Sequence, residues 1–383
     1  MLGDFDGASR LPRVHRAGHR REFGVTLQFE KRQHPSRVMV VGSPVLAILL
    51  TVIVGGILFA ARGLEPLPAL YVYFVEPVTT LWSIEELVVK ATPLVLIGAG
   101  LAVCFRANVW NIGAEGQLTM GAIVGAAIPV LATEWQSPLA LPLMMGLGIA
   151  GGMAWAAIPA LLRNRFGANE ILTSLMLVYV AQLVLDWLVR GPWRDPEGYN
   201  FPESVALQGV QLLPTLGYSR VHLGGAFALL AVLVLFVFLS RTLKGFEIQV
   251  SGDAPRAGGF GGFRRPRTVW FCLLLSGGLA GLAGIGEIAG PIRQLQPTIS
   301  PGYGFTAIIV AFLGRLNPIG VLLAGIILAI SYLGGEGAQI SLGLSSKTAQ
   351  VFQGTLLFFI LACDTLIRYR LRFRVGPVAE LPR

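Results

Sequence analysis

The sequence predicts an all-α polytopic membrane protein with about ten transmembrane helices, some of them broken or re-entrant. Hydrophobic residues make up 54% of its 383 residues and charged residues only 13%, about half the charged fraction of a typical soluble domain. Apolar stretches recur along the chain, and a membrane-spanning helix needs roughly 20 apolar residues. The chain also has 48 glycines and 23 prolines, which membrane helices tolerate because neighbouring helices satisfy the freed backbone groups.

The apolar stretches divide the chain into two polar tails and one membrane domain. We expect residues 1–37 to form a basic cytoplasmic tail, 38–367 the transmembrane domain, and 368–383 a cytoplasmic C-terminal tail. The expected spans are 38–61, 84–105, 117–133, 138–162, 170–189, 221–240, 268–286, 304–316, 317–334 and 348–367. The segment 304–316 is too short to cross a membrane alone.

The positions of Lys and Arg predict the orientation, because positively charged loops stay on the cytoplasmic side. With ten spans, 23 of the 30 Lys and Arg residues lie on the side of the N-terminus and seven on the other side. We therefore expect both termini to be cytoplasmic, 190–220 to be an extracytoplasmic loop and 241–267 to be a basic cytoplasmic loop. The aromatic residues of 62–83 indicate a short helix at the membrane interface on the outside.

Several function classes are excluded or disfavoured by the composition. The net charge of +9 is explained by the cytoplasmic loops and tails, so we expect no nucleic-acid partner. No GxxxxGK[ST] loop is present to bind phosphates. Three of the four histidines lie in the N-terminal tail and His222 stands alone, while the three cysteines are isolated. We expect no catalytic residue, no metal site and no cofactor on this chain, and therefore not an enzyme.

A polar run interrupts the apolar sequence between Phe105 and Gln117. It contains Asn108, Asn111 and Glu115 together with glycines, and such residues are costly against lipid. Two interpretations fit. The run is either a cytoplasmic turn whose side chains cap two helix ends, or a broken helix that offers hydrogen-bond donors and acceptors to a neutral, hydroxyl-rich or heterocyclic solute.

Two further interruptions are typical of helix starts and breaks. Asn169 and Glu170 fit the first turn of a helix, where an acidic residue complements the helix dipole. Residues 300–305, Ser-Pro-Gly-Tyr-Gly-Phe, and the later Asn317-Pro318 pair indicate a broken or re-entrant element, which is tolerated only where the backbone is buried in protein or lines a cavity. Gating and a simple tight turn both fit this segment.

The basic loop contains a second glycine-rich run, from residue 252 to residue 263. Asp253 fits a helix N-cap and Pro255 a first helical turn, which predicts a short cytoplasmic helix across the membrane face. Four glycines in five residues weaken such a helix, and a solvated loop is the alternative.

These motifs together resemble the permease subunits of bacterial ABC importers, in the branched-chain amino acid, ribose and nucleoside permease family. Residues 105–117 resemble the FRAxxxNIGAEGQ signature of the nucleoside and simple-sugar branch, and the likeness extends to 167–170, 252–257 and 300–318. It covers roughly residues 40–370. At positions 258 and 259, where relatives usually carry alanine and arginine, this chain has glycine.

The resemblance implies one half of a transmembrane pore in a bacterial inner (plasma) membrane. Its implied partners are a second permease subunit, usually a different chain, ATPase subunits that bind ATP and Mg²⁺, an extracytoplasmic solute-binding protein, and membrane lipid. The 252–263 loop would match the coupling helix that contacts the ATPase. A nucleoside is the first expected substrate and a simple sugar the second.

From the motifs and the resemblance we assign three sets of candidate residues. The expected substrate pathway contains Phe105, Asn108, Asn111, Gly113, Glu115, Gln117 and Tyr303. Expected ATPase-coupling residues are Gly252, Asp253, Pro255, Arg256 and Ala257. Expected gating or structural residues are Asn169, Glu170, Pro301, Gly302, Gly304, Asn317 and Pro318. The alternative function is an ion- or proton-coupled secondary transporter, which would need ionisable residues deep in the spans.

Overall fold

The computed structural model describes residues 23–31, 37–133, 135–217, 219–345 and 347–377. The elements are β1 (Phe23–Lys31), α1 (Arg37–Ala61), α2 (Pro66–Phe74), α3 (Leu81–Arg106), α4 (Ala114–Leu131), α5 (Ala140–Phe166), α6 (Glu170–Arg190), α7 (Gly224–Arg241), α8 (Leu243–Asp253), α9 (Pro255–Phe260), α10 (Arg265–Glu287), α11 (Tyr303–Leu313), α12 (Pro318–Leu342), α13 (Lys347–Arg368) and β2 (Tyr369–Pro377). Short helical turns at Glu76–Val78, Gly209–Gln211 and Ile288–Ile292 complete the order.

Each of the ten expected spans coincides with a helix, but not all ten helices are long enough to cross a membrane. Among the described residues, eight helices are long and apolar enough to do so: α1, α3, α4, α5, α6, α7, α10 (as Arg265–Ile292) and α12. Helix α11 has 11 residues, about 16 Å at the helical rise. The described apolar part of α13, Gln350–Cys363, is also short. The structure therefore supports a polytopic membrane protein with eight candidate spans.

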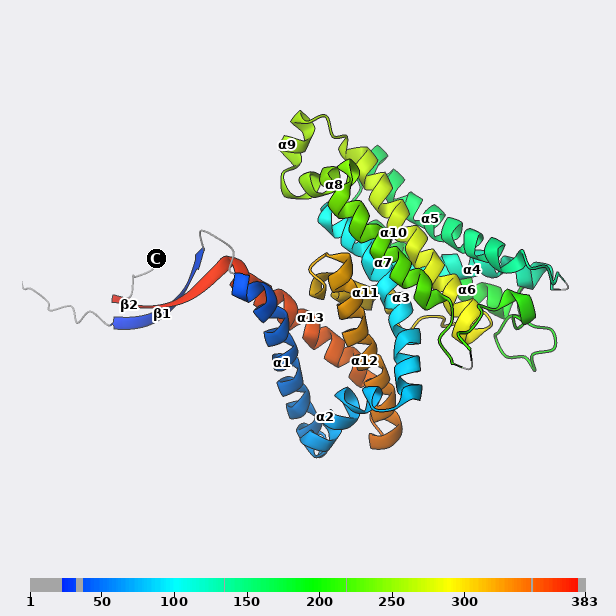
Figure 1. Cartoon of the computed structure of the whole chain (residues 1–383), viewed down its shortest axis with the longest axis horizontal. Helices are drawn as coiled ribbons and strands as arrows, with labels where there is room; N and C mark the ends of the chain where they lie inside the picture. Colours follow the sequence, from blue (N-terminus) through cyan, green and yellow to red (C-terminus); the bar gives the residue numbers. More distant parts are fainter. Residues whose placement is uncertain (1–22, 32–36, 134, 218, 346, 378–383) are drawn as a thin grey trace, which may run out of the picture.

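Helix α3 is the centre of the bundle (Figure 1). It packs against α7 and α10 on one side and against α11 and α12 on the other. Because it is enclosed, residues 94–104 are buried without interruption. A helix that is apolar all round is expected at such a position.

Glycines allow the backbones of α5 and α10 to meet. A methyl group on Gly281 would lie 2.2 Å from the carbonyl oxygen of Gly148, and one on Gly152 would lie 2.1 Å from that of Gly277. Small residues four apart are a common means of close helix packing in membranes. The close packing makes α4, α5 and α10 one tight unit, because the same glycine-rich face of α10 also meets α4.

A second unit consists of α1, α2, α12 and α13. Tyr73 of α2 is fully buried, with its ring centroid 4.4 Å from that of Phe352 in α13. Its hydroxyl shares a hydrogen bond of 2.9 Å with Ser331 of α12. The helix predicted within 62–83 is thus confirmed, and Tyr73 anchors it.

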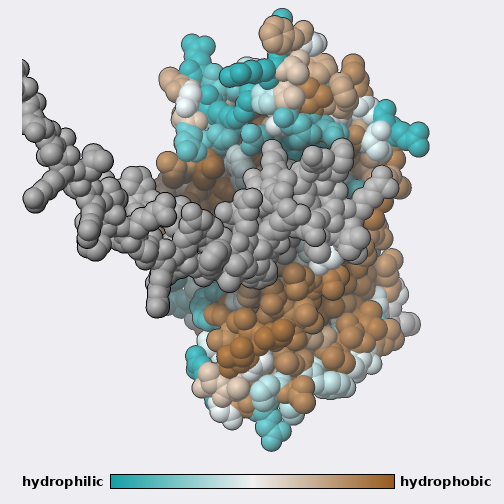
Figure 2. Space-filling view, turned by 90° about the vertical axis from the view of Figure 1, so that its left-hand side faces the viewer, coloured by the Kyte–Doolittle hydropathy of each residue, from teal (hydrophilic) through white to brown (hydrophobic). Residues whose placement is uncertain are grey.

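The surface has the distribution expected of a membrane protein. Figure 2 shows hydrophobic surface between hydrophilic ends on one face of the molecule. Large apolar side chains of the spans are exposed, among them Leu49 and Ile53 on α1 and Leu229 and Leu233 on α7. Such a band is explained by contact with lipid.

The membrane domain is helical as predicted, and the described parts of the two tails add one pair of strands. Strands β1 and β2 pair antiparallel, with Phe23 opposite Pro377 and Lys31 opposite Tyr369. They adjoin the beginning of α1 and the end of α13 (Figure 1). The pairing was not predicted because the two segments are separated by the whole membrane domain. It brings residues 23–31 and 369–377 together.

Candidate functional site

The predicted polar run forms a buried, non-helical connection between α3 and α4. Asn111 is fully buried. Its amide donates hydrogen bonds to Gln117 Oε1 (2.9 Å) and Ser276 Oγ (3.0 Å), and its Oδ1 accepts from Gln117 Nε2 (3.0 Å) and from the N–H of Gly113 (3.1 Å). The two amides therefore satisfy each other, as buried polar groups must. They hold the connection against α10 and are not free to bind a solute.

Glu115 links this connection to the second predicted break. It lies in the first turn of α4 and is 2% exposed. Its Oε2 accepts a hydrogen bond of 2.6 Å from the backbone N–H of Gly304, in the first turn of α11. Gly304 permits this approach because a methyl group there would lie 2.3 Å from the backbone nitrogen of Glu115. The structure thus joins the starts of two helices that are 189 residues apart.

A cavity opens beside Glu115. Its volume is about 480 Å³. Glu115 and Thr119 of α4 line it, together with Tyr179, Gln182 and Asp186 of α6 and residues 297–300. One residue of each predicted break, Glu115 and Ser300, lines this cavity, and its lining combines polar side chains with apolar ones.

The cavity wall on α6 was missed by the sequence analysis. Tyr179, Gln182 and Asp186 follow each other at spacings of three and four residues, so they share one face of the helix. The side chain of Tyr179 is 56% exposed. A polar stripe on a membrane helix is expected to face a water-filled cavity or another subunit rather than lipid. That spacing was the available signal.

Tyr303 is not part of the cavity lining. It is 2% exposed, and its ring meets Tyr332 of α12 edge-on at 5.4 Å between centroids. The Tyr332 hydroxyl shares a 2.8 Å hydrogen bond with Thr306, which in turn donates to Gln353 Oε1 at 3.2 Å. These contacts tie α11 to α12 and α13. Pro301 and Gly302 precede α11, where Gly302 adopts a positive φ of 103°.

The other predicted pathway residues lie at the end of α3. Phe105 is buried and stacks on Phe312 of α11 at 5.1 Å between ring centroids. Asn108 is exposed, has a positive φ of 54°, and accepts a 2.9 Å hydrogen bond from the Trp110 indole. Both residues shape the break; neither reaches the cavity beside Glu115.

The predicted helix start at Asn169 is confirmed, and Asn317, predicted only as part of a broken or re-entrant element, also caps a helix. Asn169 Oδ1 accepts from the N–H of Ile171 at 2.9 Å, and Asn317 Oδ1 accepts from that of Ile319 at 3.1 Å, with Pro318 in the first turn. Glu170 has an additional role. It forms an ion pair with Arg163 of α5 and accepts a hydrogen bond from the backbone N–H of Trp110. It therefore connects α5 and α6 to the polar run.

At the end that carries α8 and α9, one prediction is confirmed and another is wrong. Pro255 begins α9 as expected, but Asp253 is not its N-cap. Helix α8 continues through Asp253, so Ala254 occupies the cap position and no side chain caps the helix. Gly252 packs against the end of α3, where a methyl group would lie 2.0 Å from the Arg106 carbonyl oxygen.

Helix α8 is held to α10 by a polar cluster. Glu247 accepts hydrogen bonds of 2.9 Å from both Lys244 Nζ and Thr268 Oγ1. Burial opposes ionisation of this carboxyl, but these two hydrogen bonds and the positive charges of Lys244 and Arg267 keep its pKa below the ordinary value. Beyond the cluster, α9 projects from the bundle (Figure 1), and Phe260 at its end is 94% exposed.

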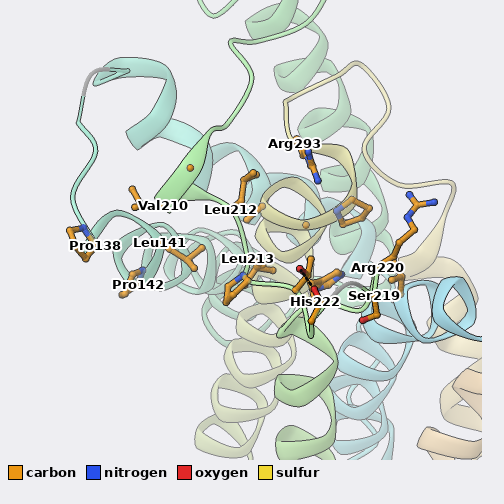
Figure 3. Close-up of a pocket in the computed structure, with 18 residues that line it drawn as sticks. Pro138, Leu141, Pro142, Val210, Leu212, Leu213, Ser219, Arg220, His222 and Arg293 are labelled. Atoms are coloured by element: carbon orange, nitrogen blue, oxygen red, sulfur yellow. Dashed lines mark hydrogen bonds between the residues drawn. The ribbon is translucent and has the colours of Figure 1, made fainter.

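A larger cavity, of about 1100 Å³, lies at the opposite end of the bundle. Figure 3 shows His222, Arg220 and Arg293 on one side of it and Pro138 and Pro142 on the other. His222 Nδ1 accepts a 3.1 Å hydrogen bond from the N–H of Gly224, while its Nε2 is buried without a partner. Burial lowers the pKa of this imidazole. The described residues contain no cluster of His, Cys, Asp and Glu that would hold a metal ion.

The comparison with known families decides what this architecture is. Residues 83–361 match the family described as the branched-chain amino acid transport system permease component. The chain belongs to this family. The resemblance noted in the sequence is therefore confirmed, and the chain is a multi-pass transport subunit and not a catalyst.

Several ABC permeases are similar over most of their length. The glucose ABC transporter permease protein TsgB13 of Haloferax volcanii is 36% identical, covering 90% of this chain and 93% of the relative. The guanosine ABC transporter permease protein NupP of Bacillus subtilis is 28% identical, covering 88% and 96%. The nucleoside ABC transporter permease protein NupB of Lactococcus lactis is 24% identical, covering 83% and 89%. No solved structure matches the chain significantly.

Proposed function

We propose that this permease forms one half of the pore of an ATP-driven importer and passes a neutral, sugar-containing solute. The observation that carries the proposal is the polar cavity beside Glu115. It is walled by α4, α6 and the break before α11, and its side chains offer hydroxyl, amide and carboxyl groups. Such groups recognise hydroxyl-rich solutes by hydrogen bonds. No residue of the chain is assigned covalent chemistry.

The predicted pathway residues have different roles in this proposal. Glu115 lines the cavity and therefore contacts the solute directly. Asn111 and Gln117 keep the connection between α3 and α4 in place through their mutual hydrogen bonds. The residues around Gly304 are assigned to gating, because the Glu115 to Gly304 hydrogen bond links the start of α11 to the cavity wall on α4.

A glucose-like sugar is the first substrate to test, since the 36% identical relative is a glucose permease by name. A nucleoside is the second candidate. It is favoured by the names of the two other relatives and by the exposed ring of Tyr179 at the cavity, which offers a surface on which a base can stack. Both solutes are neutral and share a sugar ring.

We propose that the second half of the pore is a different chain. In Haloferax volcanii two permeases are similar to this chain: TsgB13 at 36% identity over 90% of the chain, and the putative TsgC13 at 30% over 60%. Bacillus subtilis likewise has NupP, covering 88%, and NupQ, covering 61%. The consistent difference in coverage indicates that this chain is the counterpart of TsgB13 and NupP within such pairs.

The remaining partners are an ATPase at the end with α8 and α9 and a solute-binding protein at the other end. Phe260, Pro255 and Arg256 at the protruding α9 are suited to contact a groove on the ATPase, which binds the ATP and Mg²⁺. Gly252 transmits movement of α8 to the end of α3, because the two backbones touch there. This arrangement requires 241–267 and both tails to be cytoplasmic. We therefore propose an ATP-driven importer in place of the ion-coupled transporter.

The test is co-purification and ATP hydrolysis. The tagged chain, expressed with its neighbouring transporter genes and extracted in mild detergent, should bring down an ATPase and a second permease in stoichiometric amounts. Asp253→Lys, which places a positive charge beside the proposed contact, should lower solute-stimulated ATP hydrolysis, while Arg62→Gln, an exposed residue between α1 and α2, should not. A chain that purifies alone and moves solute with an ion gradient would refute the proposal.

A further inference from the structure

A small cavity lies where α3, α7, α8 and the start of α12 meet. Its volume is about 270 Å³. Arg106, Ser240, Thr242, Gln249 and Asn317 supply its polar lining, and Phe236 is among its apolar residues. It is separate from the solute cavity beside Glu115, with which it shares no lining residue.

The cavity carries a positive charge without a counter-charge. Arg106 is half-buried at the end of α3, and its guanidinium has no hydrogen-bonding or ion-pairing partner in the described chain. No acidic residue is among those that line the cavity. The carboxyl group of Glu247 on α8 is engaged by Lys244 and Thr268. Arg241, at the adjoining end of α7, adds a further exposed positive charge. The electrostatics therefore favour an anion.

The neutral side chains supply hydrogen-bond donors for that anion. Asn317 uses its Oδ1 to cap α12, so its amide N–H groups remain available. Gln249 is exposed and forms no side-chain hydrogen bond in the described chain. Ser240 and Thr242, by contrast, donate to carbonyl oxygens of α7 at 2.6 and 2.7 Å. Arg106, Gln249 and Asn317 thus each have a donor group available. These groups can donate hydrogen bonds to the oxygen atoms of a phosphate diester, which only accept.

An apolar strip continues from the cavity along α7. Leu229, Leu233, Phe236 and Ser240 follow each other at spacings of three and four residues, so they share one helix face. Leu229 is 55% exposed and Leu233 is 60% exposed. A cationic pocket at the end of a lipid-facing helix matches a molecule with an anionic head and a long apolar tail.

We propose that this cavity binds the phosphate group of an anionic phospholipid, whose acyl chains lie along α7. The phosphate accepts hydrogen bonds from Arg106, Gln249 and Asn317, and its charge offsets that of the guanidinium. Because the lipid contacts α3, α8 and α12 together, it braces α8 where Gly252 packs on Arg106. The site is independent of the transported solute.

The test uses the purified full-length chain and native mass spectrometry with added phosphatidylglycerol or phosphatidylcholine. The wild-type chain should retain phosphatidylglycerol in preference to phosphatidylcholine. Asn317→Asp keeps the oxygen that caps α12 but replaces the amide donor by a negative charge, and should weaken phosphatidylglycerol retention about tenfold or more, the loss expected of a charge-assisted hydrogen bond. Arg106→Gln should weaken it similarly.

Two matched controls and one competitor make the test decisive. Asn169→Asp changes the equivalent cap of α6, and Arg165→Gln removes an exposed arginine that does not line the cavity; both should retain the lipid as the wild type does. Equal retention by Asn317→Asp and the wild type would overturn the proposal. So would thermal stabilisation by millimolar inorganic phosphate equal to that by phosphatidylglycerol, which would indicate a site for free phosphate instead.

Discussion

The carboxyl group of Glu115 accepts a 2.6 Å hydrogen bond from the backbone N–H of Gly304, and this contact joins the two breaks in the membrane domain. Neither break would be stable against lipid, because unsatisfied backbone groups are costly there. Together they satisfy one donor of the α11 start with a side chain from α4. The contact also borders the proposed solute cavity, so a change in either helix start alters the cavity wall.

Replacing Glu115 should separate its two roles. Glu115→Gln retains an oxygen that accepts from Gly304, whereas Glu115→Ala leaves that buried N–H without a partner, at a cost of about 1 to 3 kcal/mol. We expect Glu115→Ala to lose about five- to 150-fold in solute uptake, since 1.4 kcal/mol corresponds to a factor of ten, and Glu115→Gln to lose far less. Uptake of labelled solute into cells, normalised to the amount of membrane-inserted protein, measures this. Equal loss in both variants would argue against the hydrogen bond as the cause.

The close approach at Gly304 predicts a strong effect of a single methyl group. In Gly304→Ala the added methyl would lie 2.3 Å from the Glu115 backbone nitrogen, and a backbone atom cannot move aside as a side chain can. Overpacking of this kind costs about 1 to 3 kcal/mol. Gly337→Ala is the control, because nothing lies within 4 Å of its added methyl. Thermal unfolding in detergent should show a lower midpoint for Gly304→Ala alone.

The helices could be predicted from the sequence because each depends on a local apolar run. Helix α6 illustrates this: Asn169 and Glu170 marked its first turn, and the structure has the helix begin at Glu170. The number of crossings was less predictable. Whether the 11 residues of α11 cross a membrane depends on the break before Tyr303 and on its contact with Glu115, and both are set by partners distant in the sequence.

The cavity could be predicted only in part, for the same reason. The polar run around Asn111 was visible, but its amides bind each other and Ser276, a pairing that depends on how α10 folds back. Gln182 was overlooked because its signal is the spacing that it shares with Tyr179 and Asp186, which was not examined as one helix face. Asp253 was assigned to the wrong helix, since the sequence alone does not show that α8 continues through it.

The α6 wall of the cavity predicts a specificity effect. Gln182→Leu removes the amide from the stripe that includes Tyr179 and Asp186, without altering a side chain that is buried in the bundle. We expect uptake of the solute to fall severalfold while the protein level is unchanged, because the variant loses hydrogen bonds of about 0.5 to 1.5 kcal/mol. Val180→Ala, at an exposed position of α6 that does not line the cavity, should leave uptake unchanged. The opposite result would place the solute elsewhere.

The exposed ring of Phe260 predicts the strength of the ATPase contact. A 94% exposed aromatic residue at the end of a projecting helix is suited to fill a pocket on a partner, and such anchors contribute about 2 kcal/mol or more. Phe260→Ala should therefore reduce ATPase co-purification at limiting concentration by more than about tenfold. Phe166→Ala removes another exposed aromatic ring, 73% exposed at the end of α5, and should have little effect. Undiminished recovery with Phe260→Ala would exclude Phe260 as an anchor.

The buried imidazole of His222 predicts a pH dependence of stability. Burial lowers its pKa in the folded protein, so the unfolded chain binds more protons once the pH falls below the ordinary histidine value of about 6.5. Its contribution is thus fully present above that pH and is lost as the pH falls toward the lowered value, with a slope of at most about 1.4 kcal/mol per pH unit. The unfolding midpoint of the wild type should decrease from pH 7.5 to pH 5.5. His222→Gln lacks the titrating group and should show a shallower decrease, even though the other three histidines remain. If the midpoints of the wild type and the variant fell in parallel with pH, His222 would not be the group that binds the proton.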